Sequence, residues 1–312
     1  MRRAVLTLLI SLGLCILIAL SFSRINPPSG RDWALSFAFV ICSWAASLSL
    51  SWLADLTLPK AQTRWLVPTI FGIGIIAAWE AYVHVSAIPV VLLPSPSEIA
   101  GRFVTAFPIL KADFVQTILR AVIPGWLMGS GAGFLVALLC DRNDFLRRGL
   151  LPLGNLVAAL PIVGVAPILV MWFGFDWPSK AAMVVVMTFF PMLINTLAGL
   201  NASGEMERDL MRGYGADWFT TLIKLRLPAA MPFIFNALKI NSTLAMIGAI
   251  VAEFFGTPIV GMGFRMSTEV GRQNLDMVWA EIAVAAISGS IFYGCLAFAE
   301  RKITFWHPSY RR

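Results

Sequence analysis

Long apolar runs alternate with short polar segments along almost the whole chain. A run of about 20 apolar residues is long enough to cross a bilayer as a helix. The pattern therefore predicts an all-α, polytopic membrane protein with about eight transmembrane helices. The expected spans are residues 4–23, 33–54, 65–83, 114–140, 149–175, 181–200, 233–255 and 281–299. Between the spans, we expect a turn and a helix start at 94–98, a tight turn at 176–180 and a glycine-rich loop at 256–279.

The composition agrees with this placement in a membrane. Of the 312 residues, 58% are hydrophobic and 13% are charged, whereas a soluble domain has about 25% charged residues. The net charge of +7 comes from basic residues between the spans, where they set topology rather than bind nucleic acid. The cysteines all lie in apolar runs, so we expect buried, small hydrophobic residues and no disulfide framework or metal site. They are Cys15, Cys42, Cys140 and Cys295.

The distribution of lysine and arginine indicates the orientation. With the N-terminus inside, fifteen of the 24 lysines and arginines fall on inside segments and seven on outside segments. An excess inside is what the positive-inside rule requires. We therefore expect a multi-pass protein of the cell (inner) membrane, with cytoplasmic N- and C-termini and a cytoplasmic segment at 201–232.

The first apolar run has two possible interpretations. Arg2 and Arg3 precede it, and a basic start before an apolar stretch is also typical of a cleaved signal peptide. The run is long for a signal peptide and has no clear small-x-small site before Arg24. A retained span is therefore favoured, and cleavage would leave the orientation of the other spans unchanged.

The polar segment at 201–232 has its own helical pattern. Met206, Leu210 and Tyr214 recur every four residues, so one stripe of the first predicted helix is apolar and the rest is charged. Gly213 and Gly215 then interrupt the helix, because glycine disfavours a helix interior and permits a sharp turn.

A second short helix is predicted after this turn. Asp217 can cap it, and Pro228 and Pro232 are expected to end it, because proline cannot donate to a continuing helix. Taken alone, the two helices could equally be an ordinary amphipathic hairpin at the membrane interface. The residues expected on one face of the second helix are Trp218, Phe219, Leu222 and Ile223.

The spacing in this segment resembles the coupling motif of permease subunits of binding-protein-dependent ABC importers. That motif consists of Glu-Ala-Ala, three residues, Gly, nine residues and Ile-x-Leu-Pro. Asp209-Leu210-Met211 stands at the first triplet, Gly215 at the glycine, and Leu225-Arg226-Leu227-Pro228 at the end. The spacing is kept, but Asp replaces Glu and larger side chains replace the alanines.

The resemblance covers roughly residues 114–308 and is closest to the importers of nitrate, taurine, sulfonates and pyrimidine precursors. It implies a type I ABC importer permease-like core at 114–308, preceded by an extra transmembrane pair at 1–64 and by a third span with an external loop at 65–113. A cytoplasmic tail would follow at 309–312. The other resembling stretches are LLPSPSEI (92–99), MWFGF (171–175), FFPMLINTLAGL (189–200), LRLPAAMPFI (225–234) and VAEFFG (251–256).

The same resemblance implies the partners. The sequence contains no Gly-x-x-x-x-Gly-Lys-[Ser/Thr] phosphate loop, so the chain carries no cofactor and ATP acts through a cytoplasmic ABC ATPase subunit. The other implied partners are a second permease copy, expected as a homodimer, an external solute-binding protein and the lipid bilayer. Nucleic acid is not expected. The expected ATPase-coupling residues are Glu207, Asp209, Leu210, Met211, Gly215, Ala216, Leu225, Leu227 and Pro228.

Polar residues inside the spans are candidates for the translocation path. Glu253 is the foremost candidate, because an ionisable group within a membrane faces protein or water. Asn195 and Asn241 are weaker candidates and fit interhelical hydrogen bonding equally well. Arg120 and Lys239 are expected to snorkel to the interface. The four-residue repeat of Gly125, Gly129 and Gly133 predicts the close approach of another helix.

The resemblance implies an importer permease that moves a small solute by alternating access. It also implies that the solute is an organic anion, such as a sulfonate, taurine or nitrate, or a pyrimidine or vitamin precursor. An ion-gradient-driven secondary transporter is the alternative, although it would need midplane ionisable groups and an internal repeat. A membrane-embedded enzyme is disfavoured, because no metal-ligand set or carboxylate pair occurs at helical spacing.

Overall fold

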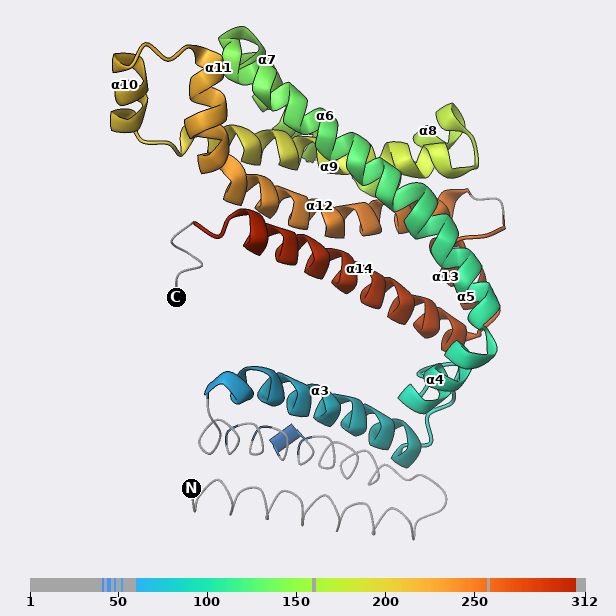
Figure 1. Ribbon diagram of the computed structural model, residues 1–312. Helices are drawn as coiled ribbons and strands as arrows, with labels where there is room; N and C mark the ends of the chain where they lie inside the picture. Colours follow the sequence, from blue (N-terminus) through green and yellow to red (C-terminus); the bar gives the residue numbers. More distant parts are fainter. Residues whose placement is uncertain are drawn as a thin grey trace. The chain divides into compact units, whose positions relative to one another are not determined.

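The computed structural model describes residues 60–158, 161–256 and 259–306, together with Ile41, Trp44, Ala45, Leu48 and Trp52. The regular structure of these residues is helical, which confirms the predicted all-α class (Figure 1). The expected N-terminal pair at 1–64 lies almost entirely outside the described residues. The chain divides into two compact units: Met1–Ala106 with Glu269–Ala280, and Phe107–Thr268 with Glu281–Arg312.

The first unit contains α3 (Lys60–Val85) and α4 (Pro96–Thr105). The predicted helix start near Pro94 is confirmed, because Ser95 caps α4 and forms a capping box with Glu98. The backbone N–H and the hydroxyl of Ser97 donate to Glu80 of α3 at 2.9 and 2.7 Å. These bonds fix the start of α4 to α3.

One continuous helix opens the second unit. It consists of α5 (Phe107–Phe114), the π-helical η1 (Val115–Val122) and α6 (Ile123–Arg142). The sequence placed the start of this span at residue 114, whereas the helix already begins at Phe107. The apolar pattern stops at Asp113, but this aspartate is fully buried and pairs with Arg265, so the helix extends back through it.

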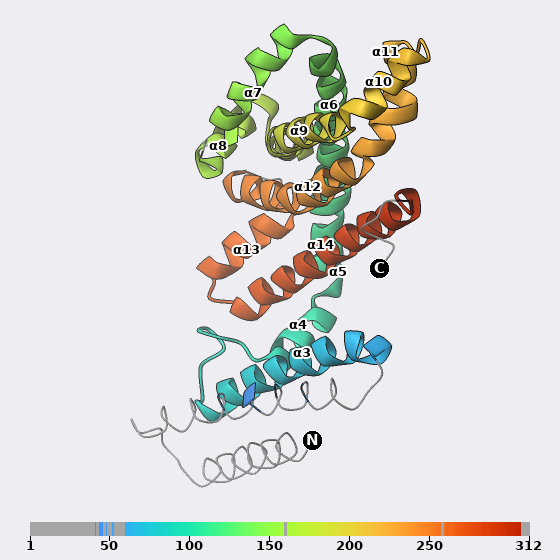
Figure 2. The same ribbon diagram turned by 90° about the vertical axis from the view of Figure 1, so that its left-hand side faces the viewer.

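The centre of the second unit is α9 (Trp177–Asn201), which packs against α6 and against α12 (Leu227–Phe255) (Figure 2). The close approach predicted from the glycine repeat is confirmed, and α9 is the helix that approaches. A methyl group on Gly125 would lie 2.6 Å from Cβ of Val184, and one on Gly129 would lie 2.9 Å from Cα of Val185. Only glycine allows α6 and α9 to approach this closely.

The expected span at 149–175 is divided into two shorter helices. These are α7 (Asp144–Ala158) and α8 (Ile162–Phe173), with 15 and 12 residues. Pro161 stands before α8 in an extended conformation, with φ −69° and ψ 108°. Neither helix alone is long enough to cross a bilayer of ordinary thickness.

Four helices in the described residues are long and apolar enough to span a membrane. They confirm a polytopic protein, while the count of eight is not confirmed. The expected third span coincides with α3, which is not among the four. These are Phe107–Arg142, Trp177–Asn201, Trp218–Phe255 and Leu275–Ile303.

The remaining helices lie at the two ends of α12. Its start is reached through α10 (Glu205–Gly213), α11 (Trp218–Thr221) and the π-helical η2 (Leu222–Arg226). Beyond its end come α13 (Met262–Gly271) and α14 (Leu275–Ile303). The predicted loop at 256–279 therefore contains a helix.

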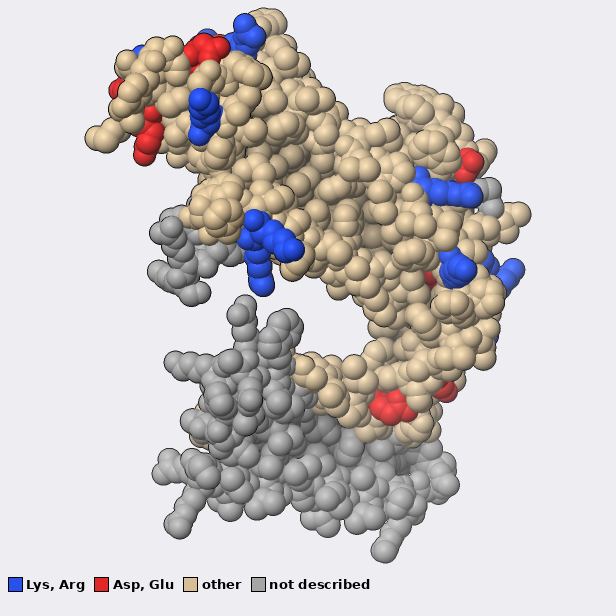
Figure 3. Space-filling view, in the orientation of Figure 1, with Lys and Arg blue, Asp and Glu red and all other residues tan. Residues whose placement is uncertain are grey.

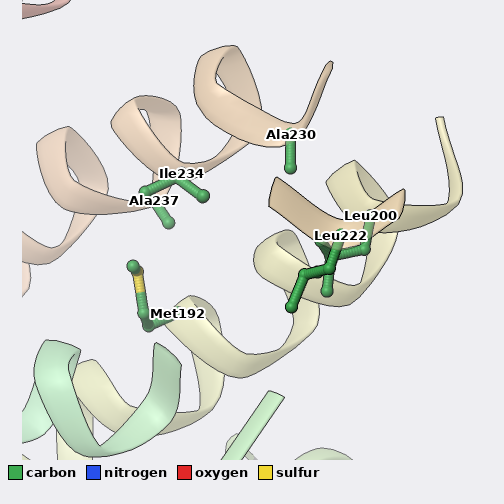
Figure 4. Packing of buried hydrophobic residues seen from close by; sticks show 6 residues of the cluster. All are labelled: Met192, Leu200, Leu222, Ala230, Ile234 and Ala237. Atoms are coloured by element: carbon green, nitrogen blue, oxygen red, sulfur yellow. The ribbon is translucent and has the colours of Figure 1, made fainter. Parts of the chain in front are cut away.

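A buried apolar cluster joins η2 to the transmembrane helices (Figure 4). Leu222 of η2 packs against Leu200, at the end of α9, and against the first turns of α12. Burial of apolar side chains is the main favourable term in such packing. The entry to α12 is therefore fixed to the end of α9. The cluster consists of Met192, Leu200, Leu222, Ala230, Ile234 and Ala237.

Candidate coupling site

The helix α10 carries an apolar stripe that remains exposed. Met206 is 84% exposed, Leu210 59% and Tyr214 80%, although they form the periodic apolar face predicted from the sequence. The charged side chains of the segment lie around this stripe, at the end of the unit that carries α10 (Figure 3). An exposed apolar patch with a polar rim is typical of a protein interaction site.

A tight turn joins α10 to α11. Gly215 has a φ of +66°, a conformation that glycine adopts without strain. The predicted cap is confirmed, because the Asp217 carboxylate accepts a hydrogen bond from the Thr220 N–H at 2.9 Å. The hydrogen bonds from Thr220 stabilise the charged form and hold the pKa of Asp217 below its usual value.

The second helix of the segment is not a separate short helix, contrary to the prediction. It runs on through η2 into α12, so that Trp218–Phe255 forms one continuous helix. Pro228 lies in the first turn of α12 and Pro232 lies inside it. The π-helical turn before Pro228 displaces the preceding carbonyl groups, with which a proline ring would otherwise clash.

Arg226 connects this continuous helix to two neighbouring helices by hydrogen bonds. Its guanidinium group donates to both oxygens of Asp141, at the end of α6, at 2.6 and 2.7 Å. Its Nε donates to the backbone carbonyl of Leu200, at the end of α9, at 3.1 Å. Bidentate arginine–carboxylate pairs are strong and fix geometry. Sequence reasoning missed this role of Arg226 and Asp141, which lie 85 residues apart.

Two further contacts attach the segment to the membrane helices. Arg208 of α10 donates to the Leu200 carbonyl at 3.3 Å and to the Ser203 hydroxyl at 2.9 Å. The guanidinium group of Arg142 lies 5.5 Å from the ring centroid of Trp218, in a cation–π contact. The polar side of α10 is therefore attached to the unit, while its apolar stripe is left outside.

The structure distributes the expected coupling residues over two places. Glu207, Asp209, Leu210 and Gly215 are exposed in α10 and the following turn. Met211 and Ala216 are half-buried beside them. The others are half-buried in η2 and at the start of α12, where they belong to the attachment to the membrane helices; they are Leu225, Leu227 and Pro228.

The three path candidates occupy different environments. Asn241 of α12 is fully buried and donates to Ser130 of α6 at 2.9 Å and to the Thr188 carbonyl of α9 at 2.8 Å. Asn195 donates within α9, to the carbonyl of Pro191 at 2.8 Å. Glu253 is 1% exposed at the end of α12. The structure does not bring these three side chains together.

Several basic residues are placed differently from expectation. Lys239 does not snorkel, because it forms an ion pair with Glu300 of α14 at 2.7 Å and is 16% exposed. Lys180 was expected in a turn, but it lies in the first turn of α9, is fully buried and donates to the Phe175 carbonyl. The Cys140 side chain is buried as predicted, whereas Cys295 is exposed.

Two of the cavities in the described part of the second unit differ in their lining. One, of about 350 Å³, is lined mainly by apolar residues of α6, α9 and α12, including Trp126, Met192 and Leu238. The other, of about 830 Å³, is lined by residues that include Lys111 and Arg120. Arg120 donates to the neighbouring Gln116 at 3.2 Å and borders this cavity.

Comparison with known proteins identifies the family. Residues 129–305 match the family described as the binding-protein-dependent transport system inner membrane component. The formylaminopyrimidine transport permease protein ThiX of Halalkalibacterium halodurans is 30% identical over 250 residues, covering 79% of this chain and 98% of that protein.

Two further relatives have similar coverage. The riboflavin transport system permease protein RibX of Chloroflexus aurantiacus is 28% identical over 232 residues, covering 74% of this chain and 86% of that protein. The bicarbonate transport system permease protein CmpB of Synechococcus elongatus is 28% identical over 266 residues, covering 78% of this chain and 94% of that protein. Since the family match includes the coupling segment and more than half of the chain, this protein belongs to the inner-membrane permease family of binding-protein-dependent ABC importers.

Proposed function

We propose that the chain is the transmembrane subunit of an ATP-driven importer and that α10 receives the movement of a separate ATPase. The observation that carries this proposal is the exposed stripe of Met206, Leu210 and Tyr214 on a helix that is attached to the end of α9 and leads into the helix that Arg226 attaches to α6. A partner that binds the stripe can push on the membrane helices through this attachment. The family relationship supports a non-catalytic role for this chain.

Movement can pass directly into the membrane because α11, η2 and α12 form one helix. A displacement of Trp218 by the ATPase would move Phe255 at the far end of the same helix. Arg226 and Leu222 would carry α6 and α9 along with it. ATP binding to the partner can shift the equilibrium only if the partner binds one arrangement better than the other.

The solute and the remaining partners belong to the same proposal. The names of the relatives concern formylaminopyrimidine, riboflavin and bicarbonate, which supports a small organic anion or a heterocyclic precursor as the solute. An external binding protein would deliver it to a pair of permeases, expected as a homodimer. The coupling segment and both termini would face the cytoplasm.

The path through the membrane remains a prediction. Asn241 and Glu253 are buried between helices in this arrangement, and Asn195 is half-buried. We propose that they line the path only when α12 separates from α6 and α9 near these residues, while the attachment at Arg226 and Leu222 stays in place. Their hydrogen bonds would then be exchanged for contacts with water or with the solute.

The test is co-purification of the full-length permease with its ATPase. Leu210→Asp places a charge in the apolar stripe, and we expect binding of the ATPase to weaken by about tenfold or more. Arg212→Ala is the matched control on α10, because Arg212 lies away from the stripe and is 79% exposed. Undiminished co-purification of the Leu210→Asp variant would contradict the coupling role of α10.

A further inference from the structure

Three carboxyl groups are buried together at the end of the second unit opposite the coupling segment. Asp113 in α5, Glu253 at the end of α12 and Glu281 in α14 are each at most 1% exposed. The cations of this cluster are Lys180, which is fully buried, and Arg265, whose side chain is 19% exposed. A buried carboxylate is costly unless it is paired and hydrogen-bonded, so the partners of each group decide its charge.

Asp113 and Glu253 have the donors that ionised carboxylates require. Each accepts a hydrogen bond from a backbone N–H in the first turn of α13 or directly before it, and each accepts a second hydrogen bond from a side chain. Hydrogen bonds of this kind favour the charged form. The donors to Glu253 are the hydroxyl of Thr117 and the N–H of Gly263; those to Asp113 are the N–H of Gly261 and Nε of Arg265, all within 2.7–3.0 Å.

Glu281 has no such donor. Neither of its carboxyl oxygens accepts a hydrogen bond from a described residue, although the side chain is fully buried. The carboxyl group of Asp113 is the neighbouring side chain that interacts with it most strongly. Two carboxyl groups that share a buried site repel each other when both are ionised, so one of them retains a proton.

We propose that Asp113 and Glu281 bind one proton between them, as a buried pair of one carboxylic acid and one carboxylate. Glu281 carries the proton, and its O–H donates a hydrogen bond to the carboxylate of Asp113, which also accepts hydrogen bonds from Arg265 and Gly261.

The proton is bound only while the helices that carry the cluster stay packed. If α14 moves away from α5, water reaches the pair, and a glutamic acid in water gives up its proton at neutral pH. Proton binding therefore favours the packed arrangement of this end. The inference goes beyond the proposed function, because it requires neither the ATPase nor the solute.

Infrared spectroscopy of the full-length permease in lipid nanodiscs at about pH 7 tests the site directly. The spectrum of the wild type should contain the C=O band of a protonated carboxyl group, and Glu281→Gln should remove it. Glu300→Gln is the matched control, because Glu300 is buried on the same helix but paired with Lys239, so the band should remain. A wild-type spectrum without this band, or a band that Glu253→Gln removes and Glu281→Gln does not, would overturn the proposal.

A second measurement uses the pH dependence of thermal unfolding. The folded permease holds one proton that the unfolded chain releases above about pH 5, so its melting temperature should fall as the pH rises toward 8. This fall should be smaller in Glu281→Gln, whose amide donates a hydrogen bond to Asp113 without a titrating proton, and unchanged in Glu300→Gln. Equal pH dependence in the wild type and in Glu281→Gln would refute the shared proton.

Discussion

The two ends of the second unit use charged residues in opposite ways. At the coupling end, Arg226 is matched to Asp141 and to the Leu200 carbonyl, while the apolar stripe of α10 stays outside. At the opposite end, Glu253 and Glu281 are buried with their neighbours. One end thus presents a surface that needs a partner, and the other encloses its polar groups within the chain.

This contrast suggests a division of labour between the two ends. The coupling end behaves as a rigid attachment, because a one-to-one ion pair and a continuous helix leave α11 little freedom relative to α12. At the opposite end, hydrogen bonds to Asp113 and Glu253 hold the first turn of α13 and the residue before it. Breaking these hydrogen bonds would expose several polar groups at once. We therefore expect the helices at this end to separate together and not one by one.

The largest expected effect comes from breaking the attachment at the coupling end. Arg226→Ala would leave Asp141, whose side chain is 4% exposed, as an unpaired buried carboxylate. Loss of one partner from a buried pair costs about 3–5 kcal/mol. Thermal unfolding of the purified permease should show this loss of stability. We also expect α12 to respond more weakly to ATPase binding.

Two further variants distinguish the loss of the buried ion pair from the loss of a charge alone. Arg212→Ala removes the exposed pair with Asp209, which is worth about 0.2–1 kcal/mol. The double variant with Asp141→Ala and Arg226→Ala removes both charges and should recover part of the stability. If Arg226→Ala and Arg212→Ala had equal effects, Arg226 would not be an anchor.

A smaller loss of stability is expected at the contact between α6 and α9, which lies between the two ends of the unit. Gly129→Ala would place a methyl group against the Thr188 hydroxyl and 2.9 Å from Cα of Val185, so α6 and α9 would have to separate. Overpacking of this kind costs about 1–3 kcal/mol. Gly131→Ala is the matched control on α6, because nothing lies within 4 Å of the added methyl group. Equal melting temperatures of the two variants would contradict the close approach.

Local sequence patterns predicted the features that depend on neighbouring residues. The stripe of Met206 and Leu210, the cap at Asp217 and the contact face at Gly129 all follow from helical spacing or from the properties of one residue type. The structure confirms each of them. Their partners could not be predicted in the same way, since spacing along one helix does not identify the helix it packs against.

The errors concern polar residues that the fold buries. From the hydropathy pattern, we predicted a span that begins after Asp113, a turn that includes Lys180 and a position at the membrane interface for Lys239. Each of these side chains has a partner inside the unit, contributed by a residue far away in the sequence or by a backbone carbonyl. The helix end predicted at Pro228 was wrong for a related reason, because the π-helical turn before this proline cannot be predicted from the composition of the segment.

The smallest expected effect concerns the start of the helix that leads into the membrane. Asp217→Ala removes the acceptor for the Thr220 N–H, so hydrogen exchange of the first turn of α11 should become faster, with little change in overall melting. The Asp217 pKa is lowered in the folded state, so the cap is complete above the usual aspartate pKa and is lost as the pH falls through the lowered value. Asp217→Asn is the matched control, because asparagine caps without titrating: its exchange, corrected for the intrinsic rate, should not change over this acidic range. If the wild type and Asp217→Asn responded identically to acid, the charge of Asp217 would have no part in holding α11 at the beginning of the rigid helix.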